Sequence, residues 1–224
     1  FGDILAEGSA KAAEMIGNGS EDLVVVGHRQ EAPAHMPQVK RSLALIYAVN
    51  PFGADHQSSE HDPSYEWYPE RMAEIGLTDP QPSDNLNEEK VKFALTTQKL
   101  YSALDSAAMC QFVFGPSWHL YSAVQFLEAI NLITGWDMEM DELIQVGERR
   151  LNMMRLFNAQ AGYTRENDNL PKKFYQALEG GPSDGVKLTE EELEAAKDLY
   201  FEMAGWDLES GNPTEEKLKE LGIS

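Results

Sequence analysis

The chain has 224 residues, and 18 basic residues against 38 acidic ones give it a formal net charge of −20. Its single cysteine cannot form an internal disulfide, a zinc finger or a complete iron–sulfur cluster, which excludes disulfide-stapled secreted scaffolds. The negative charge disfavours nucleic-acid binding, and no segment approaches the roughly 20 apolar residues of a membrane span. Because a signal-peptide pattern is also lacking, we expect a cytoplasmic protein of one large domain or two small ones sharing a core.

The N-terminus lies inside an amphipathic helical pattern. Phe1 stands where an initiator methionine would be, and apolar residues from Ile4 to Ile16 fall largely on one helical face, up to a stop signal at Gly17. We therefore expect a fragment of a longer polypeptide, cut just before a helix. A processed or tag-trimmed complete protein is the alternative.

Helical patterns dominate the rest of the chain. A β-branched run at 23–26 supports one short strand or extended segment, and a buried helix over 39–49 should stop before Pro51. A polar loop over 55–66 follows, and Asn87 is the expected N-cap of a long helix that reaches about residue 109. Further helices are predicted over 122–133 and 141–158. Another begins at a capping box of Thr189 with Glu192 and ends at about residue 205, and a short one follows Pro213. The sequence predicts an all-α, multihelical fold with at most one short strand or extended segment.

Two residues near the end of the long helix could carry chemistry. Cys110 is either a small apolar core residue or a thiolate ligand whose partners lie elsewhere. Asp105, five residues earlier, either faces water or is buried with hydrogen-bond donors, because burying an unpaired carboxylate costs free energy.

The polar loop concentrates histidines and acids. His56 and Glu60 have i,i+4 spacing, and His61 follows directly. This loop could be a solvated surface segment, a metal site, or the position of a proton-transferring histidine beside a substrate pocket.

Several short segments, taken in order, resemble the C-terminal part of the tungsten-containing aldehyde:ferredoxin oxidoreductase family. They are Gly2 to Gly8, Gly53 to His56, Asp105 to Cys110, Glu148 to Asn158, and Thr164 to Pro171, so that the resemblance covers essentially the whole chain. The spacing of Asp105 and Cys110 is the most informative of these.

The resemblance implies a domain division and three roles. Residues 1–50 would be the tail of the family's middle helical domain and residues 51–224 its C-terminal helical domain. Cys110 would be the fourth ligand of a [4Fe-4S] cluster whose other cysteines lie upstream. Asp105 would accept hydrogen bonds from a pterin of the tungsten (or molybdenum) bis-pterin cofactor, and His56 would lie near the metal as a proton donor or acceptor.

The resemblance also implies a reaction. The parent protein would oxidise aldehydes to carboxylic acids with ferredoxin as electron acceptor, as a monomer or a homo-oligomer. The fragment alone would be inactive and would bind no cofactor. Met36, Pro37 and Gln38 depart from the family's usual charged residues, which leaves the substrate open. An aryl-thioester reductase is one alternative, and a helical metal-binding domain using His56, Glu60 and His61, or a pure interaction domain, is another. We interpret Arg149, Asn152, Arg155 and Arg165 as structural residues that join helices.

Overall fold

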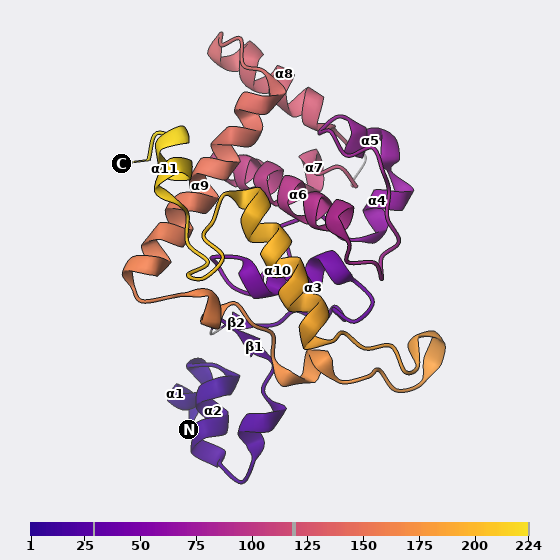
Figure 1. Ribbon diagram of the computed structural model, residues 1–224, viewed down its shortest axis with the longest axis vertical. Helices are drawn as coiled ribbons and strands as arrows, with labels where there is room; N and C mark the ends of the chain where they lie inside the picture. The colour runs from indigo at the N-terminus through magenta and orange to yellow at the C-terminus, as the bar shows by residue number, and fades with distance from the viewer. Residues whose placement is uncertain (29, 118–119, 224) are drawn as a thin grey trace.

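The computed structural model describes residues 1–28, 30–117 and 120–223, and these residues are mostly helical (Figure 1). The α-helices are α1 (Gly2–Ala6), α2 (Ser9–Ile16), α3 (Arg41–Val49), α4 (Pro63–Trp67), α5 (Pro69–Ala73), α6 (Glu88–Ser106), α7 (Gln111–Phe114), α8 (Ala123–Thr134), α9 (Met140–Gln160), α10 (Glu190–Ala204) and α11 (Glu215–Glu220). Short 3-10 helices lie at Ser20–Leu23, Arg165–Asn167, Lys172–Tyr175 and Gly181–Ser183. The predicted all-α, multihelical class is confirmed, and none of the described helices combines the length and apolar character of a membrane span.

The N-terminal segment differs in detail from the expected single helix. Gly8 has φ of 94°, which an α-helix cannot contain, and the chain divides there into α1 and α2. Of the run predicted as a strand or extended segment over 23–26, Leu23 ends a 3-10 helix and only Val26 lies in a strand. The strands β1 (Val26–Gly27) and β2 (Gln30–Glu31) form an antiparallel hairpin. Figure 1 shows α1 and α2 at one end of the molecule, with the hairpin between them and the main group of helices.

The long helices α6 and α9 cross near the centre of the molecule (Figure 1). They approach closely because Gly147 of α9 has no side chain, and a Cβ there would meet the Lys99 carbonyl oxygen of α6 at 1.8 Å. The predicted cap of α6 is confirmed, since the Asn87 side chain accepts a hydrogen bond from the Lys90 backbone N–H at 3.0 Å. The predicted capping box at Thr189 and Glu192 is also present and opens α10.

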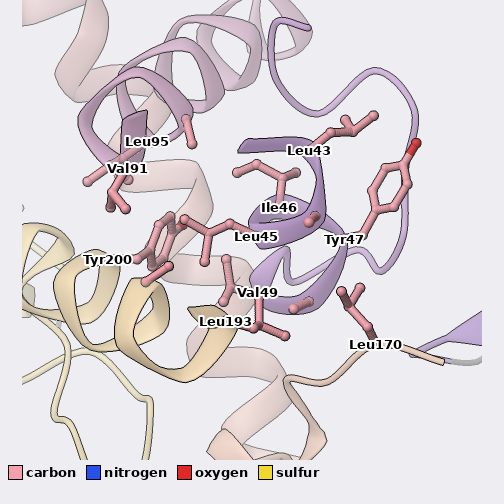
Figure 2. Packing of buried hydrophobic residues seen from close by; sticks show 14 of the residues in the cluster. Leu43, Leu45, Ile46, Tyr47, Val49, Val91, Leu95, Leu170, Leu193 and Tyr200 are labelled. Atoms are coloured by element: carbon pink, nitrogen blue, oxygen red, sulfur yellow. The ribbon is translucent and has the colours of Figure 1, made fainter. Parts of the chain in front are cut away.

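The main core is built around α3, all nine residues of which are buried. Figure 2 shows Leu45 and Val49 of α3 packed toward Tyr200 and Leu193 of α10, with Val91 of α6 beside them. A second apolar cluster joins α4, α5, α6 and α8, and it contains Tyr65, Met72, Phe93, Leu104 and Phe126. The boundary expected between residues 50 and 51 stays a prediction.

Two stretches differ from the sequence-based prediction. The polar loop predicted over 55–66 is shorter than expected, because α4 begins at Pro63. Proline is favoured in the first turn of a helix, where its missing N–H costs nothing. The long helix stops at Ser106 rather than near residue 109, and Ala108 has φ of 54°, which ends the helical path. Cys110 consequently lies outside α6, at the N-cap position of α7.

The four residues interpreted as structural all join separate segments. Arg155 is fully buried and makes a bidentate ion pair with Asp168, both contacts being 2.6 Å. Asn152 accepts from the Trp206 indole at 2.9 Å, and Arg149 donates to the Leu221 carbonyl at 2.8 Å. Arg165 contacts Glu194 and Asp198 of α10. These contacts hold the segments that follow α9 against the long helices.

Candidate functional site

The loop after α3 is fixed by a partly buried polar network. The Asn50 amide donates to the Gly53 carbonyl at 2.9 Å and to Ser58 Oγ at 2.8 Å, and Ser58 donates to Asp55 Oδ2 at 2.7 Å. Gln98 of α6 donates to Asn50 Oδ1 at 3.2 Å. This network ties residues 50–58, and with them His56, to the helical core.

Three histidines from this region meet near Lys40, at the start of α3. The rings of His35 and His56 are stacked, with centroids 4.3 Å apart and planes 11° from parallel, and the ring of His61 stands nearly perpendicular to both. His35 lies before α3, His56 in the loop after it and His61 just before α4. The path of the chain around α3 therefore brings together side chains that are up to 26 residues apart in the sequence.

Lys40, the N-cap residue of α3, forms hydrogen bonds with two of these rings. Its ammonium Nζ lies 3.2 Å from Nδ1 of His35 and 3.3 Å from Nδ1 of His61. Because an ammonium group can only donate, both Nδ1 atoms accept, and each ring carries its proton on Nε2 when neutral. His61 Nε2 then donates to the His56 carbonyl oxygen at 3.1 Å.

The cluster disfavours additional positive charge. Burial, followed by the neighbouring Lys40 and the other two histidines, lowers the pKa of His35 to about 4. Burial, then His61 and Lys40, also lowers the pKa of His56. Burial lowers the pKa of Lys40 as well, against the opposing charges of Asp62 and Glu60. Near neutral pH, His35 and His56 are therefore uncharged bases, and the Nδ1 atom of His56 is buried without a hydrogen-bond partner among the described residues.

Glu60 lies beside this cluster, but its carboxylate is hydrogen-bonded to groups outside the cluster's rings. Its carboxylate accepts hydrogen bonds from Tyr101, from the Ser64 hydroxyl, from the Ser117 hydroxyl and backbone, and from the His61 backbone N–H. Of the candidate metal ligands His56, Glu60 and His61, the structure therefore joins only the two histidines. The potential ligand nitrogens that lie within 4.8 Å of one another belong to His35, His56 and His61.

Asp105 lies at the edge of a small cavity of about 130 Å³ between α6, α9 and the loop after α3. It pairs with Arg150 of α9 at 3.2 Å and accepts from the Gln111 amide at 3.3 Å. Asp55, the neighbour of His56, lines the same cavity. Burial raises the pKa of Asp105, as does the charge of Asp55, while Arg150 opposes the shift. The cavity thus places two carboxylates where a ligand with several N–H donors could be bound.

Cys110 is exposed at the start of α7. An exposed thiol is not a core residue, so the reading of Cys110 as an apolar core residue is wrong. The position leaves the thiol open to a group supplied by another part of a protein.

No local sequence pattern assigns a role to His35, Lys40, Asp55 or Arg150. Lys40 precedes a buried helix with no motif around it, and the chain path that joins it to His61 cannot be read from local spacing. Lys40 has one local signal. Acidic residues outnumber basic ones in this chain of charge −20, so a lysine next to an apolar segment is a candidate for a specific contact.

Comparison with known proteins places the chain in a family. Residues 1–223 match the family described as aldehyde ferredoxin oxidoreductase, domains 2 and 3. Tungsten-containing aldehyde ferredoxin oxidoreductases of Pyrococcus horikoshii and Pyrococcus furiosus are 36% and 33% identical over 100% of this chain, which spans 34% of each relative's length. An aliphatic sulfonate oxidoreductase WOR-like subunit of Pyrococcus furiosus is 32% identical over 53% of the chain.

A solved structure has the same fold. The active-site complex BamBC of benzoyl coenzyme A reductase superposes with a TM-score of 0.73 over 99% of this chain and 36% of its own, at 19% identity. With the full-length match to domains 2 and 3, these similarities show that the chain belongs to the aldehyde ferredoxin oxidoreductase family.

Proposed function

We propose that this chain is the C-terminal part of a tungsten (or molybdenum) bis-pterin oxidoreductase that oxidises aldehydes to carboxylic acids and passes electrons through a [4Fe-4S] cluster to ferredoxin. The observation that carries the proposal is the arrangement around the end of α6. Asp105 lines a polar cavity there, and Cys110 follows on the surface with an exposed thiol. Names of relatives that cover the whole chain at about a third identity support the same activity.

The residues present fit the two groups. A carboxylate that accepts hydrogen bonds suits the N–H donors of a pterin, and Asp105 already receives donors from Arg150 and Gln111. A cysteine thiolate is the usual ligand of an iron–sulfur cluster, and the exposure of Cys110 allows cysteines from an upstream segment to complete the set. When bound, the tungsten or molybdenum pterin supplies the two-electron redox chemistry.

His56 would move a proton in this reaction. Oxidising an aldehyde with water to a carboxylic acid releases two electrons and two protons. The neutral imidazole of His56 can take one proton because burial and its neighbours keep it uncharged before the reaction. The stacked ring of His35 and the polar network at Asn50 and Ser58 hold it in place.

The ligand role of Cys110 is testable in the full-length protein. Replacing Cys110→Ala removes one thiolate, so the low-temperature electron paramagnetic resonance signal of the reduced cluster should disappear or convert to that of a three-iron cluster. Ser106→Ala, in the last turn of α6, is the matched control and should leave the signal unchanged. An unaltered spectrum in Cys110→Ala rules out the ligand role.

The proton-transfer role of His56 needs a separate measurement. His56→Gln keeps the shape but cannot be protonated, so turnover should fall by about 100-fold or more while tungsten content stays intact. Gln57→Ala, next to it in the loop, should keep near-normal turnover. Full activity with His56→Gln would show that another group moves the proton.

A metal-binding domain is a second candidate because three imidazoles come together. Elemental analysis of the purified chain distinguishes it from the leading proposal. One zinc or iron per chain, lost in His35→Gln, would favour the metal site.

A further inference from the structure

The outer end of α8 carries large apolar side chains that are exposed. Leu132 and Ile133 are 86% and 83% exposed, and Trp136, in the connector to α9, is 61% exposed. Figure 1 shows this end of α8 at the opposite end of the molecule from α1 and α2. The inner face of the same helix packs on the second apolar cluster through Phe126 and Ile130. A helix that is apolar on both faces is typically covered on both.

A groove with a volume of about 370 Å³ lies next to these residues, between the ends of α6 and α8, the connector and the start of α9. Its apolar lining includes Ala103, Ala107, Ile130, Trp136, Met138 and Leu143. The hydroxyl groups in its wall are already used, since Ser106 donates to the Ser102 carbonyl at 2.8 Å and Thr134 donates to the Ile130 carbonyl at 2.7 Å. At about 30 Å³ per water, the groove holds on the order of twelve water molecules, which is room for several apolar side chains.

The connector that carries Trp136 is held in one conformation. Gly135 has φ of 75° and ends α8 in the left-handed region. The Asn131 side chain then donates to the Met138 carbonyl at 2.9 Å and accepts from the Met138 N–H at 3.0 Å. Binding against a wall that is already ordered costs little conformational entropy, so the groove is preorganised for an occupant.

A second copy of the same turn shows what a tryptophan at this position contacts when its site is filled. The sequence Gly-Trp-Asp occurs at 135–137 and again at 205–207, and both glycines end a helix with positive φ. Trp206 is only 4% exposed, because it stacks on Phe201 and its indole donates to Asn152. Trp136 stands in the equivalent place, but the groove beside it is open. This difference indicates that the contacts of Trp136 come from another molecule.

Charge indicates the kind of molecule. Residues 100–148 contain no lysine or arginine. Asp137, Glu139 and Asp141, here called the acidic rim, are exposed in the connector and at the start of α9, and none of them has an ion pair within the part of the chain that the structure describes. An apolar groove with an acidic rim is complementary to an apolar surface flanked by basic residues.

Other occupants fit the rim less well. A second copy of this chain placed symmetrically here would bring two acidic rims together, and like charges across an interface oppose association. A membrane surface rich in anionic lipids would be repelled in the same way. A groove between helices instead suits an amphipathic helix, whose apolar residues at i, i+3, i+4 and i+7 enter it while basic residues remain at its edges.

We propose that this groove binds a basic amphipathic helix of a partner protein, with its apolar face against Trp136 and its lysines or arginines beside the acidic rim. The inference is independent of the proposed function, because it involves no cofactor and no residue of the histidine cluster.

The test uses the full-length protein and a fluorescein-labelled model peptide of about 18 residues, long enough to form a helix. The peptide has leucines at helical spacing and lysines at the remaining positions, and titration with the protein should raise its fluorescence anisotropy saturably. A peptide of the same composition in scrambled order lacks a continuous apolar face, and a third peptide has glutamate in place of each lysine. Each of these should bind at least about fivefold more weakly.

Two pairs of variants locate the binding site. Trp136→Ala should raise the dissociation constant of the peptide about tenfold, whereas Trp67→Ala, which removes a tryptophan that is 69% exposed in α4, should stay within about twofold.

Replacing Asp137→Asn together with Asp141→Asn should weaken binding about threefold at low salt. The control pair Glu190→Gln with Glu191→Gln, in the first turn of α10, should leave the affinity unchanged. Unchanged circular dichroism confirms that each variant is folded. Absence of saturable binding, equal binding of the scrambled peptide, or equal affinities in Trp136→Ala and Trp67→Ala would overturn the proposal.

The variant Ile133→Glu distinguishes the other occupants. Sedimentation velocity and Tm of the full-length protein should be unchanged in it, while peptide binding is lost. Conversion of a dimer to a monomer would show that a second copy occupies the groove. A lower Tm, together with no peptide binding by the original protein, would show that the upstream part of the polypeptide covers it. Either of these two results overturns the proposal.

Discussion

Buried charges in this chain are compensated by neighbours from distant segments. Arg155 and Asp168 are both fully buried, and the guanidinium also donates to the Gly211 carbonyl at 2.8 Å and lies over the Trp206 ring. Removing one partner of such a pair leaves an uncompensated charge in a medium of low polarity.

Arg155→Met should therefore lower the free energy of unfolding by about 3–5 kcal/mol, as measured by urea titration. Lys172→Met is the control, because Lys172 pairs with Asp22 at 3.4 Å while 87% of its side chain is exposed. That variant should unfold at nearly the same urea concentration as the original chain. Similar losses in the two variants would mean that the Arg155 pair adds nothing beyond a surface contact.

The histidine cluster should make stability depend on pH. The pKa of His35 is about 4 in the folded chain and near its usual 6.5 in the unfolded chain. Between these values the unfolded state binds a proton that the folded state does not, so stability is lost as pH falls from about 6.5 toward 4. His56 shifts in the same direction.

His35→Gln should reduce the loss of stability between pH 7 and pH 5, measured as the change in the urea midpoint. Gln81→Ala, which changes a residue in the connector before α6, should keep the full pH dependence. An unchanged slope in His35→Gln would show that His35 is protonated equally in both states.

At the scale of elements, helix boundaries were predictable where the signal is local. Asn87 and Thr189 cap their helices because a side chain reaches a backbone N–H only three residues away. The break at Gly8 was missed because an amphipathic pattern continues across it, and α4 was missed because its polar residues do not show which face packs. Of the candidate site, His56, Asp105 and Cys110 were singled out by residue type and took their roles from the resemblance. Lys40 and His35 depend on how the chain passes around α3.

The crossing of α6 and α9 depends on one glycine. A methyl group at Gly147 would overlap the Lys99 carbonyl oxygen and lie 2.8 Å from the Ala103 nitrogen, so the helices would have to separate. Gly147→Ala should lower the free energy of unfolding by about 1–3 kcal/mol despite the better helix propensity of alanine. Gly2→Ala in α1, where nothing lies within 4 Å, should cause no loss. A stabilising Gly147→Ala would contradict the close packing.

At the scale of the whole molecule, the net charge of −20 is the dominant electrostatic feature. Most ion pairs involve at least one exposed partner and contribute little, so repulsion among the excess acidic groups remains. At about 0.01 M salt the screening length is about 30 Å, and this repulsion extends across the molecule.

Salt should therefore stabilise the chain. Raising NaCl from about 0.01 M to about 0.1 M shortens the screening length to about 10 Å. It should raise Tm by about 2–4 °C for each kcal/mol of repulsion removed, as measured by calorimetry. Choline chloride at equal ionic strength should act equally if screening is the cause, whereas a response to sodium alone would indicate a bound cation. A lower Tm in salt would mean that the ion pairs outweigh the repulsion, and that the acidic excess is better compensated than its formal charge implies.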